Sequence, residues 1–316
     1  MSTFMQTTTS MATIWYILGG IVLFYPVIMV IIYLIQELFL FHPEKLPLYF
    51  KFDYPYPFEE LTFDTEPGAV ISGLLFRVPN SRGVVYYFHG NTRSIKGWAK
   101  FSRDFTSKGY DVMMIDYRGF GKSRGKRTEA GLFHDALYGY DWLTERYGEN
   151  NIIVYGRSMG SGFAAKVASE NHPRMLILDA PYYSLLHLFQ RYLPFVPVKR
   201  ISRFKVRTDK FLENVSFPVY IYHGTRDLTI PYSMSRRLVR LLGERSTLIT
   251  IKGGGHNNLR DYPQYHEYMY HILGAIPETE LTPEQAYFPG TEETGSDLLG
   301  SWAGLHLDVF TRPEFR

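Results

Sequence analysis

The feature that most constrains the fold is the run from Asn151 to Gly162, where a short apolar stretch leads into Gly156-Arg157-Ser158-Met159-Gly160. This is a G-x-S-x-G pattern. A serine in this pattern stands on a sharp, strained turn between a strand and a helix, so the residues two positions away on either side must be almost free of side chain. Strand-forming residues precede the pattern and a helix-like segment, residues 160–170, follows it. The run therefore predicts a nucleophile at Ser158. The alternative is a glycine-rich turn without chemistry.

From residue 61 to residue 273, strand-like and helix-like segments alternate, which is typical of a mostly parallel sheet with helices on both faces. The 316 residues, 45% of them hydrophobic, are enough to bury one large core, and we expect the domain over residues 50–276. The chain has no cysteine, which excludes disulfides, thiol nucleophiles and thiolate metal sites. Strands are expected at 70–79, 83–88, 111–116, 151–156, 175–179, 219–222 and 246–251, and helices at 98–108, 129–147, 160–170, 231–242 and 262–273.

The N-terminus carries a long apolar run. Residues 1–35 contain no charged side chain, and residues 14–35 would span roughly 33 Å as a helix, enough for the hydrocarbon core of a bilayer. We expect a short N-terminal segment over residues 1–13 and one transmembrane anchor over residues 14–41. A cleavable signal peptide and a buried core helix are the alternatives. Lys45 and Lys51 follow the run, and the positive-inside rule then favours a cytoplasmic catalytic domain.

Five motifs in the right order give the chain a resemblance to the alpha/beta hydrolase superfamily over roughly residues 61–273. The similarity is greatest to membrane-anchored serine hydrolases of the serine-aminopeptidase-like or lysophospholipase-like branch, which are related to depalmitoylases and monoacylglycerol lipases. The resemblance implies the alpha/beta hydrolase fold with a short lid. The motifs are His89-Gly90-Asn91, the run Asp116 to Ser123, the serine pattern, His223-Gly224-Thr225-Arg226-Asp227 and Gly255-His256-Asn257-Asn258-Leu259.

A serine hydroxyl is a weak nucleophile, so Ser158 needs a base, and that base needs an acid to orient it and to stabilise its charged form. In this fold the chain order is Ser, then Asp or Glu, then His. His256 follows the last expected strand in a glycine-rich loop and is the expected base. Asp227 follows the strand at 219–222 and is the expected acid, with Asp179 as the alternative. For His256 the alternative is a surface loop histidine.

The oxyanion that forms during acyl transfer needs hydrogen-bond donors held in place beforehand. In this fold one donor is the backbone N–H after the nucleophile, here Met159. Following the resemblance, the backbone N–H of Asn91 is the second donor. His89 and Gly90 would shape the loop, His89 as a buried, hydrogen-bonded histidine.

Residues 119–125 look like a phosphate-binding loop but fail its tests. Asp116 stands where a P-loop needs its first glycine, and Arg124 stands where G-x-G-x-x-G needs its last. We therefore interpret the segment as a structural turn, in which Asp116 and Arg118 bond the loop backbone. No nucleotide, metal or other cofactor is implied.

Residues 183–213 occupy the usual position of a lid. Apolar and basic residues alternate there, with Asp209 the only acidic residue between 191 and 210. This composition suits a surface on anionic lipid headgroups, so we hypothesise that the lid faces the membrane and admits acyl chains; a solvated cap is the alternative. Nucleic acid is not an expected partner, because no recognised motif accompanies the charge. The basic residues are Arg191, Lys199, Arg200, Arg203, Lys205, Arg207 and Lys210.

The last 40 residues, 277–316, form an acidic tail that the resemblance does not cover. The whole sequence therefore predicts a membrane-anchored serine hydrolase without cofactor, which cleaves carboxylic ester or thioester bonds of lipid-like or acylated substrates through an acyl-enzyme on Ser158. A serine peptidase of the aminopeptidase-like branch is one alternative. A catalytically silent binding module is another, and the presence of Ser158, Asp227 and His256 favours the enzyme. Acyl length and oligomeric state are left open.

Overall fold

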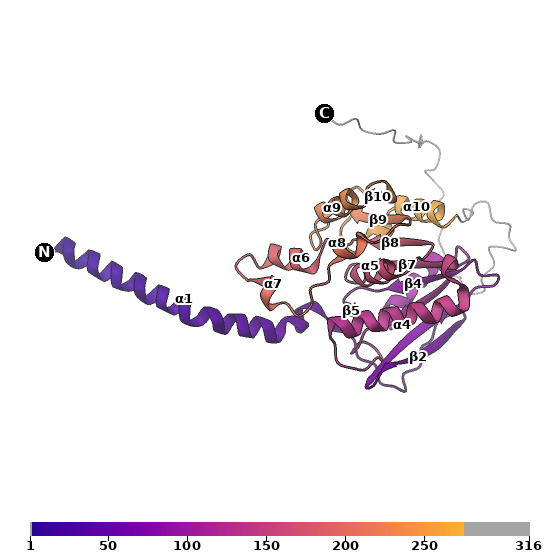
Figure 1. Cartoon of the computed structure of the whole chain (residues 1–316), viewed down its shortest axis with the longest axis horizontal. Helices are drawn as coiled ribbons and strands as arrows, with labels where there is room; N and C mark the ends of the chain where they lie inside the picture. Colours follow the sequence, from indigo (N-terminus) through magenta and orange to yellow (C-terminus); the bar gives the residue numbers. More distant parts are fainter. Residues whose placement is uncertain (1, 275–316) are drawn as a thin grey trace, which may run out of the picture. The chain divides into compact units, whose positions relative to one another are not determined.

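The structure is a computed structural model that describes residues 2–274. The acidic tail expected at 277–316 lies outside the described residues. An apolar helix, α1 (Ser2–Leu40), comes first and continues through Pro26 (Figure 1). One helix in the described part is long and apolar enough to cross a membrane, over Trp15–Leu40, and none of its most apolar window is buried. The exposure of side chains such as Leu23 (68%) argues against the buried core helix considered as an alternative.

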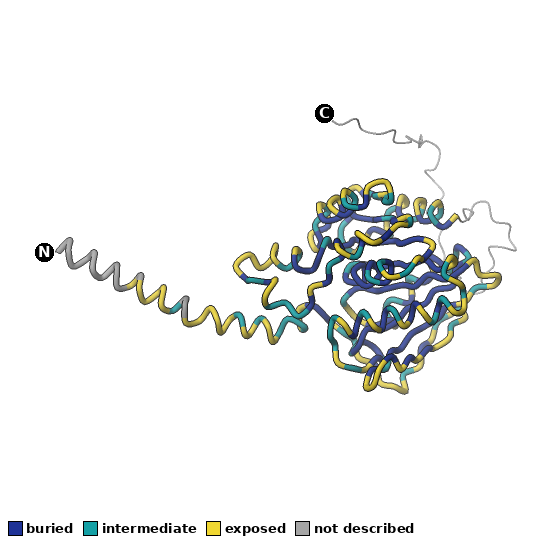
Figure 2. The backbone as a smooth tube through the Cα atoms, in the orientation of Figure 1, coloured by how far each residue is buried: buried dark blue, intermediate teal, exposed yellow. Residues whose placement is uncertain are grey.

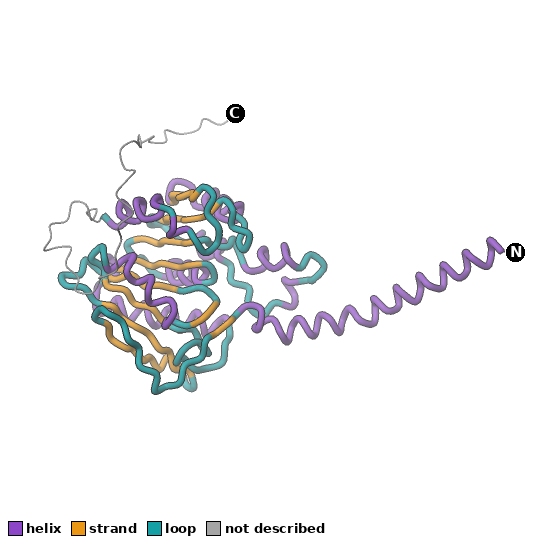
Figure 3. The backbone as a smooth tube through the Cα atoms, turned by 180° about the vertical axis from the view of Figure 1, so that it is seen from behind, coloured by secondary structure: helices purple, strands orange, loops and turns teal. Residues whose placement is uncertain are grey.

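Eight strands form one sheet in the spatial order β10-β9-β8-β7-β4-β6-β3-β2. Figure 3 shows the strands in orange, side by side through the domain. Only β3 runs antiparallel to its two neighbours, and all other neighbouring pairs are parallel. The predicted mostly parallel sheet is therefore confirmed. The strands are β2 (Phe58–Glu66), β3 (Ala69–Phe76), β4 (Val84–Phe88), β6 (Asp111–Ile115), β7 (Ile152–Arg157), β8 (Met175–Asp179), β9 (Val219–Gly224) and β10 (Ser246–Ile251).

Helices cover both faces of the sheet. Because side chains alternate between the two faces along each strand, one strand contributes residues to both cores. In β4, Val84, Tyr86 and Phe88 join one core with α4 (Glu129–Tyr147), α5 (Gly160–Glu170) and α9 (Tyr232–Leu242). Val85 and Tyr87 join the other core with α10 (Pro263–Leu273) and the segment that follows β4. Both cores are buried, as the dark blue tube shows (Figure 2).

The helix predicted over residues 98–108 is wrong in extent and continuity. The chain instead forms three short pieces, α2 (Ile95–Trp98), the 3-10 turn η1 (Ala99–Ser102) and α3 (Arg103–Thr106). The segment contains glycine, serine and threonine, which favour a continuous helix less than alanine or leucine does. The Trp98 indole also donates to the carbonyl of Thr92 at 2.8 Å, which holds the first piece against the loop before it.

A second, two-stranded sheet was not predicted. β1 (His42–Pro43), immediately after α1, pairs in parallel with β5 (Thr92–Arg93), just after β4. Strands of two residues leave no periodic pattern in the sequence. This small sheet joins the end of the apolar helix to the loop that contains Asn91.

The residues expected to form the lid contain α6 (Leu185–Tyr192), α7 (Val198–Ile201) and α8 (Thr208–Leu212) (Figure 1). The Ser184 hydroxyl caps α6 by accepting from the backbone N–H of His187. α8 packs against α5, the helix that follows the serine pattern. The lid is thus attached to the helix that begins beside Ser158.

Candidate active site

The strand order places two loops beside each other. The chain passes from β4 to β6 on one side and later returns to β7 on the other, and β4 and β7 pair with Phe88 opposite Gly156. In open α/β sheets, ligands bind at the carboxyl ends of the strands where the strand order reverses in this way. The loop after β4 and the serine turn after β7 therefore lie side by side at such a position.

The turn after β7 has the geometry required of a nucleophile elbow. Ser158 has a φ of 52°, in the left-handed region that residues other than glycine rarely adopt. A Cβ on Gly156 would come within 2.5 Å of the carbonyl oxygen of Gly160. A Cβ on Gly160 would come within 2.2 Å of the carbonyl oxygen of Phe88. Both glycines thus let the turn pack closely enough to present Ser158.

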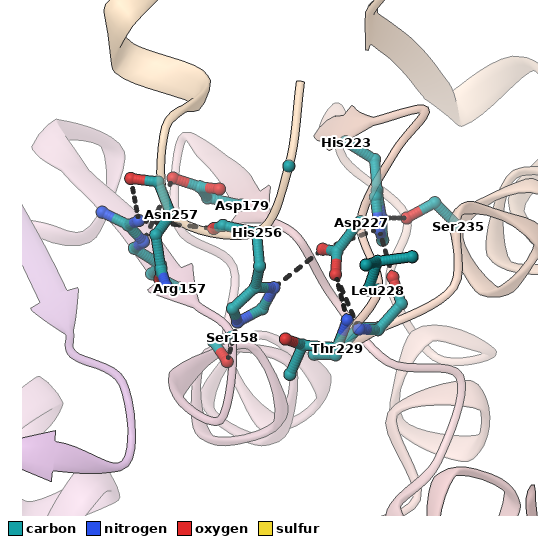
Figure 4. A network of polar contacts seen from close by, with 12 residues as sticks. Arg157, Ser158, Asp179, His223, Asp227, Leu228, Thr229, Ser235, His256 and Asn257 are labelled. Carbon is teal, nitrogen blue, oxygen red and sulfur yellow. Dashed lines mark hydrogen bonds and ion pairs between the residues drawn. The ribbon is translucent and has the colours of Figure 1, made fainter. Parts of the chain in front are cut away.

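Three predicted residues from three separate loops come together at this turn (Figure 4). The Ser158 hydroxyl lies 2.9 Å from Nε2 of His256. Nδ1 of the same ring lies 2.7 Å from a carboxylate oxygen of Asp227. With Nδ1 facing a carboxylate, the proton belongs on Nδ1 and Nε2 is left free to accept the hydroxyl proton. The arrangement suits proton transfer from Ser158.

The Asp227 carboxylate is held in its ionised form. The backbone N–H groups of Thr229 and Ile230 donate to its Oδ1 at 2.8 and 2.7 Å. Burial by itself would raise the pKa of Asp227, but hydrogen bonds from His223 and His256 bring it well below its ordinary value. A permanently ionised Asp227 is what an imidazolium at His256 would need.

His223 contacts Asp227 as well, although no role for it was expected from the sequence. Its Nε2 lies 2.8 Å from the carbonyl of Ile230 and 3.3 Å from Oδ2 of Asp227, so this nitrogen carries the proton. Its Nδ1 lies 2.6 Å from the Ser235 hydroxyl. The ring is fully buried on the far side of Asp227 from His256 (Figure 4). The motif from His223 to Asp227 could have indicated this contact, because its two end residues lie four apart in the chain.

Arg157 is a second such residue, inside the serine pattern itself. Its guanidinium is nearly buried and donates to the carbonyls of His256 at 3.5 Å and Asn257 at 3.3 Å. It also lies 3.9 Å from the Asp179 carboxylate. Burial would lower the pKa of Arg157, but Asp179 raises it overall, so the charge is kept. Arg157 therefore connects the elbow to the loop that carries His256.

Asp179, the alternative acid, has different partners. Its carboxylate accepts from the Tyr155 hydroxyl at 2.6 Å, and its backbone carbonyl accepts from the N–H of Ser158 at 2.8 Å. Among residues 2–274 it makes no hydrogen bond to a histidine. Asp179 therefore supports the nucleophile turn rather than the base.

The loop after β4 lies against the nucleophile. A Cβ on Gly90 would be 4.0 Å from the Cβ of Ser158. In the described part of the chain, the backbone N–H groups of Asn91 and Met159 donate to no other group, which leaves both free to bind an anion. The Asn91 side chain donates to the carbonyl of Leu40 at 3.0 Å. The loop is thus fastened to the end of α1.

His89 is the buried, hydrogen-bonded histidine that was expected from the sequence. It is fully buried, and its Nδ1 lies 2.7 Å from the carbonyl of Gly90. The Tyr117 hydroxyl donates to the His89 carbonyl at 2.7 Å. These contacts fix the shape of the loop before Asn91.

The turn over residues 119–125 was expected to be held by bonds from Asp116 and Arg118 to its backbone, but both side chains bond mainly to other segments. Asp116 accepts from the N–H of Ile95 at 2.8 Å, so its side chain bonds the segment after β4 rather than its own loop. The Arg118 guanidinium donates one hydrogen bond to the carbonyl of Lys126, next to the loop. Its main partner is the Asp135 carboxylate, to which two of its nitrogens donate at 2.7 and 2.8 Å. The glycine Gly121 is required because a Cβ there would overlap the Asp116 carboxylate.

Known proteins resemble the chain in sequence and in fold. The family described as serine aminopeptidase, S33, matches residues 79–209. A lysophosphatidylserine lipase ABHD12 of Xenopus tropicalis is 29% identical over 207 residues, which are 59% of this chain and 54% of that protein. The mouse protein of the same name is 28% identical over 211 residues, 60% of this chain and 53% of its own. The chain therefore spans about half the length of these curated relatives.

Among solved structures, an esterase of Pyrococcus furiosus has a TM-score of 0.59 at 20% identity, covering 74% of this chain and 96% of that one. Est1E of Butyrivibrio proteoclasticus, solved with ferulic acid, has a TM-score of 0.56 at 18% identity, with 67% and 97% covered. At these identities the likeness establishes the fold alone.

Proposed function

We propose that this chain, a member of the alpha/beta hydrolase superfamily, is a membrane-anchored serine hydrolase that cleaves carboxylic ester or thioester bonds of lipid-like substrates. The observation that carries the proposal is the continuous hydrogen-bonded path from Ser158 through His256 to Asp227, at 2.9 and 2.7 Å. A binding module without catalysis has no need to keep this geometry or the strained φ of Ser158.

The reaction has two halves. In the first, the Ser158 hydroxyl oxygen attacks the carbonyl carbon while its proton passes to Nε2 of His256. The negative charge on the carbonyl oxygen is stabilised by the N–H groups of Asn91 and Met159. The intermediate then collapses, the bond to the leaving oxygen or sulfur breaks, and His256 returns the proton to that atom.

In the second half, water attacks the acyl group on Ser158 and gives its proton to His256. The bond to Ser158 breaks, the serine recovers its proton from His256, and the carboxylic acid leaves. Asp227 remains ionised throughout and stabilises the imidazolium in both halves. The chemistry needs only side chains and backbone amides of this chain.

Two observations favour lipid-like substrates. The first is α1, whose apolar span Trp15–Leu40 is long enough to cross a bilayer and has no buried residue in its most apolar window. The second is the similarity to proteins named lysophosphatidylserine lipase. The preferred class of substrate is therefore an ester at a membrane surface, such as that of a single-chain phospholipid. Thioesters and peptides are the substrates to compare with it. We further propose, from the positive-inside rule applied to Lys45 and Lys51, that the domain is cytoplasmic.

Labelling by a fluorophosphonate probe tests the proposal on the full chain in detergent. We expect the wild type to be labelled and Ser158→Ala and His256→Ala to lose labelling. Ser169→Ala and His134→Ala, on α5 and α4, are matched controls that should keep it. A folded wild type without labelling would overturn the proposal. Labelled enzyme would then be assayed with ester, thioester and peptide substrates of increasing acyl length.

A further inference from the structure

Two buried ionisable side chains beside the loop after β4 take no part in the proposed catalytic cycle. Nε2 of His89 lies 3.4 Å from Oδ1 of Asp116, and both side chains are completely buried. His89 directly follows β4 and Asp116 directly follows β6, and these two strands are parallel neighbours in the sheet. The pair therefore lies at the carboxyl ends of two central strands, and His89 comes two residues before Asn91.

The hydrogen bond from His89 decides which of its ring nitrogens carries a proton. Nδ1 lies 2.7 Å from the carbonyl oxygen of Gly90, and a carbonyl oxygen can only accept, so Nδ1 is protonated. In a neutral ring with this proton, Nε2 would be a bare lone pair facing the Asp116 carboxylate. A lone pair and a carboxylate oxygen repel each other, and the low dielectric of a buried site strengthens that repulsion.

The Asp116 carboxylate has few donors to stabilise a negative charge. Its Oδ1 accepts from the N–H of Ile95 at 2.8 Å, while its Oδ2 has no hydrogen-bond partner among the residues that the structure describes. A Cβ on Gly121 would overlap Oδ2, so the turn closes directly over this oxygen. Burial therefore raises the pKa of Asp116 above its ordinary value, although the contacts with His89 and Ile95 oppose the rise.

One additional proton between the two side chains removes both problems. On Nε2, it makes the ring an imidazolium that faces a carboxylate; on Asp116, it makes an acid that donates to Nε2. Either state is neutral overall, which costs far less in a buried site than a lone carboxylate beside a neutral ring. The nearby side chains of Ser94 and Lys96 donate to Glu44 rather than to Asp116, and the negative Glu44 also favours keeping the proton.

The proton on Nδ1 bears on the oxyanion site through a single peptide group. The carbonyl of Gly90 and the N–H of Asn91 belong to the same peptide, which is planar, so its C=O and N–H point in opposite directions. The hydrogen bond from His89 to the carbonyl therefore turns the Asn91 N–H away from the ring. It also polarises the peptide, which makes that N–H a stronger donor, and a charged ring does this more strongly than a neutral one.

We propose that His89 and Asp116 share one proton at neutral pH, and that this proton keeps His89 in the state that orients the oxyanion donor at Asn91. The proposal rests on the proposed function, because the Asn91 N–H has a catalytic role only in a hydrolase. His89 is a positioning residue, since it acts on the donor through the peptide that follows it. Asp116 serves the same end, because it keeps the proton on Nδ1 and holds the segment at Ile95.

The protonation state of the pair can be measured on the full chain in detergent without any turnover. Isotope-labelled histidine gives NMR signals for the ring nitrogens, and His89→Asn identifies those of His89 by their loss. The infrared difference between the wild type and Asp116→Asn detects a carboxylic acid at Asp116. At neutral pH we expect either protons on both nitrogens of His89 or a carboxylic acid at Asp116. A ring with one proton, together with an ionised Asp116, would overturn the proposal.

Kinetics of the same variants on a soluble ester test the effect on the donor. Asp116→Asn keeps an acceptor for Ile95, but a neutral His89 can then move its proton to Nε2 and leave Gly90 without a donor. We expect kcat to fall about 10-fold with KM little changed, a part of the loss that removing a whole oxyanion donor causes. His89→Asn keeps an N–H for Gly90 and should lose a similar factor, whereas His89→Leu should lose about 100-fold. Equal activity of the two His89 variants would contradict the proposal.

Asp135→Asn is the matched control for the loss of a buried charge. Asp135 is a buried carboxylate whose hydrogen bonds join it to Arg118 and Thr65. It should lower the stability to thermal unfolding while the folded protein keeps its kcat. If Asp116→Asn behaved in the same way, the pair would be structural only and the proposal would be wrong. A wild type without fluorophosphonate labelling would instead overturn the hydrolase, and the spectra would still report the shared proton, so the two failures are distinct.

Discussion

The side-chain amide of Asn91 donates a hydrogen bond of 3.0 Å to the carbonyl oxygen of Leu40, the last residue of α1. The carbonyl of Asn91 in turn accepts from the N–H of His42 at 2.8 Å. The loop with one proposed oxyanion donor is therefore bonded on both sides to the chain that leaves the apolar helix. The end of α1 helps to position the loop as well as to tether the domain.

Asn91→Ala keeps the backbone donor but removes the bond to Leu40. We expect kcat to fall between about 10-fold and 100-fold with KM little changed, because a small displacement of the donor weakens stabilisation of the transition state. Steady-state kinetics on a soluble ester measure this, with Asn150→Ala as the matched control. An unchanged kcat would show that β1 and β5 hold the loop by themselves.

His223→Ala removes a donor from Asp227, so the pKa of Asp227 should rise towards its ordinary value of 3.8. In the wild type this lowered pKa gives stability that is fully present above the unfolded-state value and is lost as pH falls through the folded-state value. The variant should be less stable at neutral pH, and its stability should change less steeply below about pH 5. Chemical denaturation at several pH values measures both effects.

His223→Gln is the conservative variant for the same position, since its amide can donate where the ring nitrogen did. It should restore part of the neutral-pH stability. If His223→Ala and His223→Gln had the same stability at every pH, the contact from His223 to Asp227 would not be the cause of the change in stability.

Arg157→Met should loosen the loop that carries His256, because the bonds to the carbonyls of His256 and Asn257 disappear. We expect kcat to fall about 10-fold or more and KM to change little, since the Arg157 side chain makes no hydrogen bond to Ser158 and acts through the loop that carries His256. The variant also leaves Asp179 without its cation, so thermal unfolding must be followed in parallel. A loss of stability with normal kcat in the folded fraction would assign Arg157 a purely structural role.

Gly160→Ala should be strongly destabilising, because the added Cβ would lie 2.2 Å from the carbonyl oxygen of Phe88. Overpacking of this kind costs about 3 kcal/mol in the free energy of unfolding. Denaturant unfolding in detergent measures the loss. Gly243→Ala, at a positive φ of 60° but with no atom within 4 Å of the new Cβ, separates backbone strain from steric overlap. Comparable losses of unfolding free energy in the two variants would contradict steric overlap as the cause in Gly160→Ala.

Several elements could be read from local sequence alone. The helices at Glu129–Tyr147 and Gly160–Glu170 and the strands at Met175–Asp179 and Ser246–Ile251 have the predicted bounds. Each has an apolar pattern that registers in the sequence, and the first helix lies between the capping residue Thr128 and Gly148 while the second begins at Gly160. The short pieces between Ile95 and Thr106, and the two-residue strands β1 and β5, lack such periodicity and were missed.

The sequence by itself determined the chain order of the elements, the elbow around Ser158 and the candidate bases and acids, because these depend on residue type and on neighbours along the chain. Tertiary structure decided which groups meet. Asp227 rather than Asp179 lies beside His256, Asn91 reaches Leu40, and Tyr25 meets Phe195 across 170 residues of chain. Contacts between distant residues depend on how whole helices and strands pack, and packing is a property of the assembled core that no local pattern contains.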